Sequence, residues 1–470
     1  MKRIILIILL LFLVAGSVFS QDTANSLSGA QVMEIVKRFH PVALQADILV
    51  EKAKTDITIA RGHFDPVLQN KSARKTFDGT QYYNYNRPEL NIPTWFGIEL
   101  RVGFEYLSGD RTVPTDTRGE SNFIGLSVPV GKNLLMNKRM AALQTARIFR
   151  EASPVERRNI LNNLLRDALN SYWSWTSHYM KYKILSDAVT VNEKRMNLVR
   201  NAYLMGDRPA IDTTEALAQL QQFELLKSQA WLDFQNAGLE LSLYLWTADA
   251  RPYYLPETTV PADDLQKMNT TTIGLPELNP LLDAARNEHP ELLLYRYKLR
   301  ALTVDRKLKF QELLPSVTFT YNQLGKGYGI TKTFNNPLFE NNFQYGIQAG
   351  IPLRFSQGRG EYRKAKLGIT ETQLQQSQKL LLVENKVKSY FNELATLKNQ
   401  LELQEKACLN YATLQRGEET RFRAGESSLF LVNTRENKAL EAFRQLQELK
   451  VRFIQTGISL QWAAGQLYNP

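Results

Sequence analysis

One segment of this chain occurs twice, and the duplication restricts the possible folds more than any other feature. The dipeptide His40-Pro41 returns as His289-Pro290 and Pro66 returns as Pro315, each 249 residues later and in unbroken register. Each copy is followed by alternating strand-like runs and then by a very long helical stretch. Self-similarity of this kind marks architectures built from repeated supersecondary units. The sequence therefore predicts two repeats of helix, strands and helices.

The first twenty residues have the pattern of a secretory signal peptide. Two positive charges precede an apolar run from Ile4 to Ala15, and small residues surround a cleavage point after Ser20. A retained anchor helix is the alternative, although the run is short for a bilayer. The predicted segments are a signal peptide at 1–20, a first repeat at 21–250, a proline-rich linker at 251–280 and a second repeat at 281–470.

Composition and motifs argue against several functional classes. The net charge is +11 over 470 residues, and the basic residues are dispersed rather than clustered with aromatics, so nucleic acid is not an expected partner. No phosphate-binding glycine loop, nucleophile motif or metal-ligand spacing is present. His40 and His289 precede prolines and are interpreted as local structural residues. We therefore expect no enzyme activity, no metal and no cofactor.

Long helices are predicted in both repeats. The stretch Arg359–Arg423 contains no proline, and at about 1.5 Å per residue a helix there would span roughly 95 Å. Such a helix needs partners along its length, as in a coiled-coil-like bundle. In the first repeat, Ser153-Pro154 and Glu156 resemble a helix start, so a break or restart is expected there. Helices are expected at 29–63, 132–204, 210–247, 279–312, 359–423 and 428–465.

Four runs alternate apolar and polar residues, at 97–107, 121–130, 316–324 and 343–353. Strands of about ten residues with one apolar and one polar face suit a membrane barrel. A soluble, half-buried sheet has the same period and is the alternative. Glu, Arg, Gln and Gly on the second face favour a barrel with a wet lumen. The residues predicted to face lipid are Ile98, Leu100, Val102, Phe104, Phe343, Tyr345 and Ile347.

Residues 66–94, rich in Tyr and Asn, do not alternate cleanly. The helices on either side of each strand block belong on one side of the membrane, so each block needs an even number of crossings. We therefore assign one strand pair to each repeat and interpret 66–94 as an extra hairpin or loop outside the membrane. Four strands do not close a barrel with a lumen, and an open edge in lipid leaves backbone groups unpaired. Several copies must share one barrel, and three would supply twelve strands, a number the patterns alone do not select.

The ordered set of features resembles the TolC family of outer-membrane efflux proteins over about 29–465. The set comprises the His-Pro pair of each repeat and the prolines Pro129 and Pro352 that precede the long helices. It also includes a glycine turn in each helical hairpin, at Gly206 and Gly425, which lie 219 residues apart.

The resemblance implies a mainly α-helical chain with membrane β-structure. It implies a homotrimer that shares a twelve-stranded outer-membrane β-barrel, a long periplasmic α-barrel and an equatorial belt that includes 251–280. The implied location is the Gram-negative outer membrane, with an extension into the periplasm. The implied function is a passive duct of a tripartite efflux or type I secretion system. Its implied partners are outer-membrane lipid, a periplasmic adaptor protein and an inner-membrane pump. A soluble periplasmic coiled-coil adaptor or structural protein is the alternative.

The two glycine turns are the candidate site, although ordinary helix-hairpin turns would have the same local sequence. In the TolC family they form the closed periplasmic entrance, with acidic residues at the constriction. Asp212 and Glu215 match acidic positions in the first copy, whereas Leu431 and Thr434 occupy them in the second. Two means of closure stay open, a ring of Glu426 and an apolar plug of Phe430 and Leu431.

We also expect Arg208 to pair with Glu426 of the neighbouring hairpin. The candidate gate residues are Gly206, Asp207, Arg208, Asp212, Glu215, Gly425, Glu426, Phe430 and Leu431.

Overall fold

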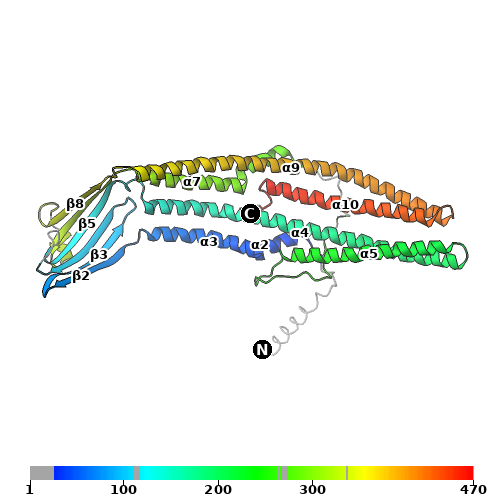
Figure 1. The fold of residues 1–470 in the computed structure, drawn as a ribbon, viewed down its shortest axis with the longest axis horizontal. Helices are drawn as coiled ribbons and strands as arrows, with labels where there is room; N and C mark the ends of the chain where they lie inside the picture. Colours follow the sequence, from blue (N-terminus) through cyan, green and yellow to red (C-terminus); the bar gives the residue numbers. More distant parts are fainter. Residues whose placement is uncertain (1–25, 111–116, 263–264, 266–273, 335–336, 469–470) are drawn as a thin grey trace, which may run out of the picture. The chain divides into compact units, whose positions relative to one another are not determined.

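Strands from both repeats lie in one antiparallel sheet with the order β2-β3-β4-β5-β7-β8 (Figure 1). The computed structural model describes residues 26–110, 117–262, 265, 274–334 and 337–468, and the predicted signal peptide lies outside them. The four predicted strands are confirmed, although the last ends at Gly350 rather than Leu353. The strands are β2 (Val67–Phe77), β3 (Thr80–Pro93), β4 (Glu99–Ser108), β5 (Gly119–Gly131), β7 (Ser316–Lys326) and β8 (Phe343–Gly350).

The sheet has six strands rather than the predicted four, because 67–93 forms two strands that join it. The turn between β2 and β3 consists of Asp78 and Gly79, with φ angles of 51° and 74°. Positive φ at both positions is the requirement of a tight two-residue hairpin, and Asp-Gly is a preferred sequence for it. This dipeptide was the available signal for the hairpin. The clean alternation of the other strands is missing here, since polar residues lie on both faces.

Helices make up most of the rest of the described chain. They are α2 (Gly29–Phe39), α3 (Pro41–Gly62), α4 (Lys138–Leu204), α5 (Ala210–Ser242), α6 (Leu278–Glu288), α7 (Pro290–Gln311), α8 (Ile330–Phe334), α9 (Ser356–Arg423) and α10 (Leu429–Ala463). None of the described helices combines the length and the apolar character needed to cross a membrane.

The first helix of each repeat is divided in two at its His-Pro pair, where the sequence predicted one continuous helix. Proline lacks the N–H that the preceding turn would accept. The histidine Nδ1 then accepts the N–H of the residue two positions later, at 3.1 Å for Val42 and 3.3 Å for Glu291. Burial lowers the pKa of His40, which favours the neutral ring that can act as an acceptor. Both histidines therefore have a local structural role.

Helix α4 continues through Pro154, so the predicted break there is wrong. Proline at this position leaves the carbonyl of Arg150, four residues earlier, without its helical donor. The hydroxyl of Ser153 donates to that carbonyl at 3.1 Å, and Ser153 is buried. Ser153 thus compensates for the proline instead of capping a new helix.

The described residues form two units, and each unit draws on both repeats. The helical unit comprises Met1–Leu44, Ile160–Asp283 and Asn385–Pro470. The sheet unit comprises Gln45–Asn159 and Ala284–Glu384. Helices α4 and α9 contribute residues to both units.

An aromatic cluster forms the main core of the helical unit. Trp175 stacks on Phe234 with ring centroids 5.7 Å apart, and Tyr172 packs beside Trp175. Two short strands, β1 (Ser26–Leu27) and β6 (Val260–Pro261), pair in parallel and attach the linker to this unit. The aromatic cluster on α4 therefore serves packing.

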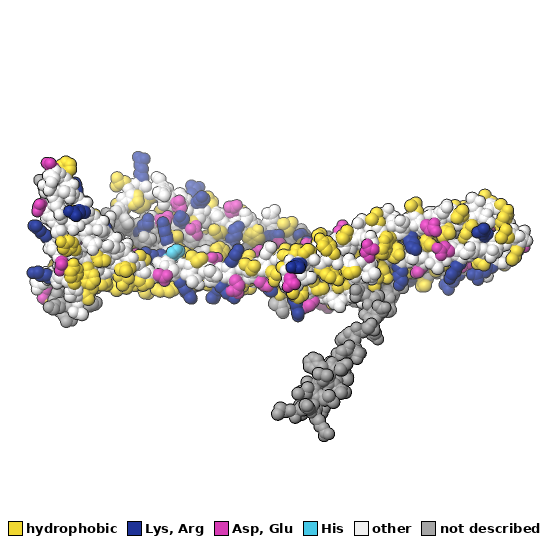
Figure 2. All heavy atoms as spheres, turned by 90° about the horizontal axis from the view of Figure 1, so that it is seen from below, with side chains coloured by type: hydrophobic (Ala, Val, Ile, Leu, Met, Phe, Trp, Pro, Cys, Tyr) yellow, Lys and Arg dark blue, Asp and Glu magenta, His cyan; other side chains and the backbone are white. Residues whose placement is uncertain are grey.

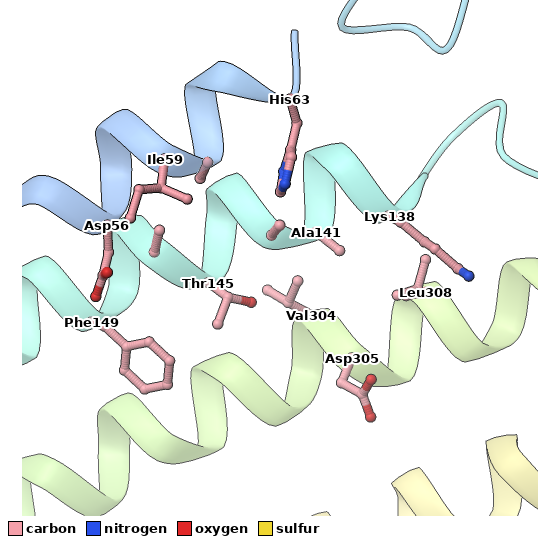
Figure 3. A pocket seen from close by; sticks show the side chains of 13 residues that line it. Asp56, Ile59, His63, Lys138, Ala141, Thr145, Phe149, Val304, Asp305 and Leu308 are labelled. Carbon is pink, nitrogen blue, oxygen red and sulfur yellow. The ribbon is translucent and has the colours of Figure 1, made fainter. Parts of the chain in front are cut away.

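In the sheet unit, small apolar residues pack α3, α4 and α7 together. A groove of about 470 Å³ lies between these helices, lined by residues that include Ile59, Phe149 and Val304 (Figure 3). Its polar lining residues include His63 and Asp305. Within the described part of the chain, no group of three His, Cys, Asp or Glu side chains is placed to hold a metal ion.

Candidate functional site at the helical hairpin turns

The turn between α4 and α5 is closed by two backbone hydrogen bonds. Gly206 donates to the carbonyl of Tyr203 at 3.0 Å, and Asp207 donates to that of Ala202 at 2.9 Å. This pair of bonds defines a Schellman helix end, which needs a left-handed residue. Gly206 supplies it with a φ of 82°. Pro209 lies at the N-cap position just before α5.

The turn between α9 and α10 has the same backbone. Gly425, with a φ of 79°, donates to the carbonyl of Phe422, and Glu426 donates to that of Arg421. The returning helix differs, because Ser428 caps it and accepts the N–H of Leu431 at 3.4 Å. The duplication is therefore retained in the backbone of the turns, while the side chains around them diverge.

Arg208 links the two hairpins of the helical unit. Its guanidinium lies 4.1 Å from the ring centroid of Phe422 and donates to the carbonyl of the same residue at 3.0 Å. It also lies 3.7 Å from the carboxylate of Asp212. Among the ion pairs between described residues, none joins Arg208 to Glu426 within the chain. Within the chain, Arg208 thus stacks on the second hairpin.

An apolar layer lies next to this contact. Val199 of α4 and Ala216 of α5 pack against Leu429 of α10, and Phe422 contacts the same cluster. All three of the first-named side chains are buried. The layer joins the ends of both hairpins into one hydrophobic contact.

A buried ionic network follows along α4. The guanidinium of Arg195 lies 2.5 Å from one carboxylate oxygen of Glu436, donates to the other at 3.2 Å, and lies 3.6 Å from Glu419. Asn192 donates to Glu436 at 3.2 Å. Glu436 is 3% exposed, so its charge depends on these donors. Bidentate pairs of this kind are the strong, oriented form of an ion pair.

Sequence reasoning identified neither Arg195 nor Glu436. It did identify Glu215, which accepts from Asn433 at 3.2 Å beside this network. The available signal was the position of Arg195 between the inward-facing Asn192 and Val199, three before and four after it. A charge at such a position requires a buried partner.

The remaining candidate gate residues are exposed. Phe430 is 65% exposed, and Leu431, Asp207 and Glu426 also face solvent. A groove of about 780 Å³ lies beside them, and its lining mixes Arg195, Arg208 and Glu419 with apolar side chains. The described site therefore has two parts. The first, the locked contact, consists of the Arg195–Glu436 pair and the Arg208–Phe422 contact between the hairpins. The second is an exposed, partly apolar rim at the turns. The described site has no arrangement of nucleophile and base.

The residues predicted to face lipid share one face of the sheet. Register places Leu100 opposite Leu126, and Leu126 opposite Tyr321, which in turn pairs with Tyr345. In the next row of the sheet, Val102 of β4 pairs with Ile124 of β5. Further along the same row, Gln323 of β7 pairs with Phe343 of β8. Ile98 directly precedes β4. Phe104 and Ile347 continue the same face.

The fold is that of solved outer-membrane channels. The Campylobacter jejuni CmeC outer membrane channel matches with a TM-score of 0.66 and 13% identity, over 96% of this chain and 90% of that chain. The Neisseria gonorrhoeae MtrE outer membrane channel, in its open state, matches with a TM-score of 0.66 and 13% identity, over 96% and 94%. The outer membrane protein VceC of Vibrio cholerae matches with a TM-score of 0.64 and 15% identity, over 93% and 96%. A comparison with curated protein sequences gave no match.

The second repeat also matches a known family in sequence. Residues 281–466 fit the model described as outer membrane efflux protein. The resemblance to the TolC family is therefore confirmed, as is the predicted class of a mainly helical chain with membrane β-structure. The matched family consists of channels and not of enzymes, and the whole chain has the fold of Gram-negative outer-membrane channels. Both findings support an outer-membrane efflux channel.

Proposed function

We propose that three copies of this chain form a passive duct that docks onto a periplasmic adaptor and an inner-membrane pump, in efflux or type I secretion. The observation that carries this proposal is the exposed rim at the hairpin turns. Leu204, Met205 and Ile211 of the first hairpin and Phe430 of the second are largely exposed. Exposed apolar groups beside charged ones mark protein-interaction sites. The family supports this reading, because its channels are trimeric and work with such partners.

The locked contact gives the duct a closed resting state. Arg195 and Glu436 hold the two hairpins of one chain together, and Arg208 clamps Phe422 nearer the turns. Opening requires these contacts to separate, or the hairpins to move together as one body. An adaptor seated on the rim is placed to drive either movement.

The docking proposal is tested by photocrosslinking in cells that hold the complete system. A photoreactive phenylalanine analogue replaces Met205 or Phe430, with the same label at Asp78, an exposed turn residue of the sheet, as the matched control. The tip labels should capture a periplasmic adaptor whose purification brings an inner-membrane pump with it, and the Asp78 label should not. Equal capture from all three positions would contradict the proposal.

A further inference from the structure

A polar pocket of about 430 Å³ lies in the sheet unit, where the β2–β3 hairpin joins β4. Its lining has four charged side chains, of which three are cationic. They are Lys71 of β2, Arg87 and Glu89 of β3, and Arg101 of β4. The surplus of positive charge indicates that the pocket attracts anions.

Lys71 has a cation as its direct neighbour, since the register places it opposite Arg87. Like charges directly opposite each other destabilise a sheet. The Lys71 ammonium lies 6.0 Å from the ring centroid of Tyr85, and within the described part of the chain it forms no ion pair. An anion in the pocket would therefore relieve a repulsion that the sheet itself leaves in place.

Arg87 is held in a fixed position beside Lys71. Its guanidinium lies 4.4 Å from the ring centroid of Phe123, 3.1 Å from the carboxylate of Glu89 and 4.0 Å from that of Glu105. Phe123 is 1% exposed. Gly103 leaves room for this stacking, since a Cβ there would lie 2.8 Å from Phe123. The charge of Arg87 is thus shared by two carboxylates, whereas that of Lys71 is not.

Arg101 supplies the second cation without a counter-charge. Its Nε is shielded from solvent and has no hydrogen-bond partner among the described residues. One terminal nitrogen lies 3.5 Å from the side-chain oxygen of Asn322, which is a long and neutral contact. A buried donor without an acceptor is costly. The planar fork of a guanidinium matches the oxygens of carboxylates and phosphates.

The pocket opens on the polar face of the sheet. Arg101 lies between Leu100 and Val102, which belong to the face predicted to meet lipid, and successive side chains of a strand point to opposite faces. A solute in water therefore reaches Arg101 more readily than a lipid headgroup does.

From these observations we propose that this pocket binds a soluble anion that carries a phosphate or carboxylate group. Arg101 donates hydrogen bonds to the oxygens of the anion, and Lys71 adds a positive charge on the opposite side. Glu89 opposes the ligand and limits its affinity. Such a site goes beyond the proposed duct, because binding there requires neither an adaptor nor a pump.

Isothermal titration of the full-length protein in a neutral detergent tests the site, with sodium phosphate and sodium citrate as separate probes at constant ionic strength. We expect saturable binding of at least one probe, and an affinity about tenfold lower in Arg101→Gln and in Lys71→Gln, because each variant loses a charged partner of the anion. Arg74→Gln makes the same change of charge on the opposite, exposed face of β2 and is the matched control. Equal loss in all three variants would reduce the effect to net charge and overturn the site.

A gain of affinity provides a second readout, which damage to the fold does not imitate. Glu89→Gln removes the carboxylate from the lining, so it should tighten the binding of the same probe. An unchanged or lower affinity in Glu89→Gln would contradict the proposal, as would a wild-type protein that binds neither probe.

A lipid probe separates the two sources of a phosphate group. Dihexanoyl phosphatidic acid, a short-chain lipid, carries the group as a headgroup. Tighter binding of this lipid than of inorganic phosphate, with the same loss in Arg101→Gln, would assign the pocket to a headgroup and overturn its assignment to a soluble anion. Docking at the hairpin turns is tested separately by crosslinking, so the failure of one proposal leaves the other standing.

Discussion

Arg195 shows how one residue holds the two hairpins of the helical unit together. Its partner Glu436 is almost fully buried, and Asn192 adds a further donor to the same carboxylate. Removal of one member of a buried ion pair is strongly destabilising, by about 3–5 kcal/mol, because the other charge remains without compensation. The same loss at an exposed pair is worth only about 0–1 kcal/mol.

We therefore predict that Arg195→Ala opens the entrance. The buried Glu436 carboxylate would draw in water and separate the hairpins, so single-channel current in a planar bilayer should rise. Arg200→Ala, an exposed arginine on the same helix, is the matched control and should leave the current unchanged. An unaltered current in Arg195→Ala would show that this network does not hold the closed state.

Glu156 provides a pH-dependent prediction. Burial, and secondly the nearby Glu291 carboxylate, raise the pKa of Glu156. Its ionisation therefore costs the folded state stability. The stability that the protonated carboxyl contributes is fully present below the ordinary glutamate pKa. It is lost as the pH rises through the raised pKa of Glu156 in the folded state.

Glu156→Gln should accordingly raise the Tm of the detergent-solubilised channel at neutral pH and have no effect at acid pH below the ordinary glutamate pKa. Scanning fluorimetry over a pH series measures this difference. Glu224→Gln, on the exposed side of α5, should show no such pH dependence. A constant gain at all pH values would disagree with the assigned cause.

The sequence predicted the turn glycines at the tips but not the ionic network behind them. A left-handed glycine between two helices has a local cause that short sequence segments reveal. Arg195 and Glu436 lie on different repeats, and their exposure depends on how two hairpins pack. In the sequence they have the same appearance as the many charges on solvated helix faces.

At the scale of elements, the passage of α4 through Pro154 rests on one hydroxyl. Ser153→Ala would leave the Arg150 carbonyl without a donor, at an expected cost of about 1–3 kcal/mol. Pro154→Ala restores the backbone N–H, so in that background the loss of the hydroxyl should cost much less. A double-mutant cycle on Tm measures the coupling. Additive effects would mean that Ser153 does not compensate for the proline.

Gly103 gives a second prediction for an element, the joint between the hairpin and the sheet. Gly103→Ala places a methyl group against the Pro88 carbonyl and Phe123. We therefore expect a smaller amount of the assembled, heat-resistant protein when Gly103→Ala samples are run on gels without prior heating. Gly368→Ala, in α9 with open space around it, should have no such effect. Equal yields from both variants would show that the joint tolerates displacement.

Helix and strand positions were predictable wherever the hydrophobic period was clear. Four strands and the long helices fall close to the expected ranges. The sequence predicts an extra hairpin or loop at 66–94 outside the membrane, because these residues do not alternate cleanly, and it does not predict that the hairpin joins the sheet. The helix breaks at His40 and His289 depend on a side-chain acceptor, which the spacing of hydrophobic residues does not reveal. Prediction failed where one hydrogen bond decides between two local structures.

For the whole molecule, exposed apolar rows mark the surfaces that we expect other copies to cover in the proposed trimer. Leu367, Leu374 and Leu381 repeat every seven residues on α9 and are exposed, Leu374 by 68%. Leu225, Leu232 and Leu239 form a similar row on α5. Hydrophobic side chains remain visible along the helices in Figure 2. A seven-residue apolar repeat needs a partner helix.

Leu374→Glu should therefore reduce the trimer fraction measured by light scattering in detergent, because the charge would be buried between copies. Gln373→Glu adds the same charge at the adjacent exposed position and controls for it. An unchanged trimer fraction in Leu374→Glu would place this row outside the interface.

The unequal strand numbers of the two repeats also have an evolutionary consequence. A chain whose helices must stay on one side of a membrane can gain strands only in twos, so a hairpin is the smallest tolerated insertion. One such event, in only one of the two duplicated halves, accounts for the four strands of the first repeat against the two of the second. The sheet can therefore grow by a hairpin without any change in the helices on either side of it.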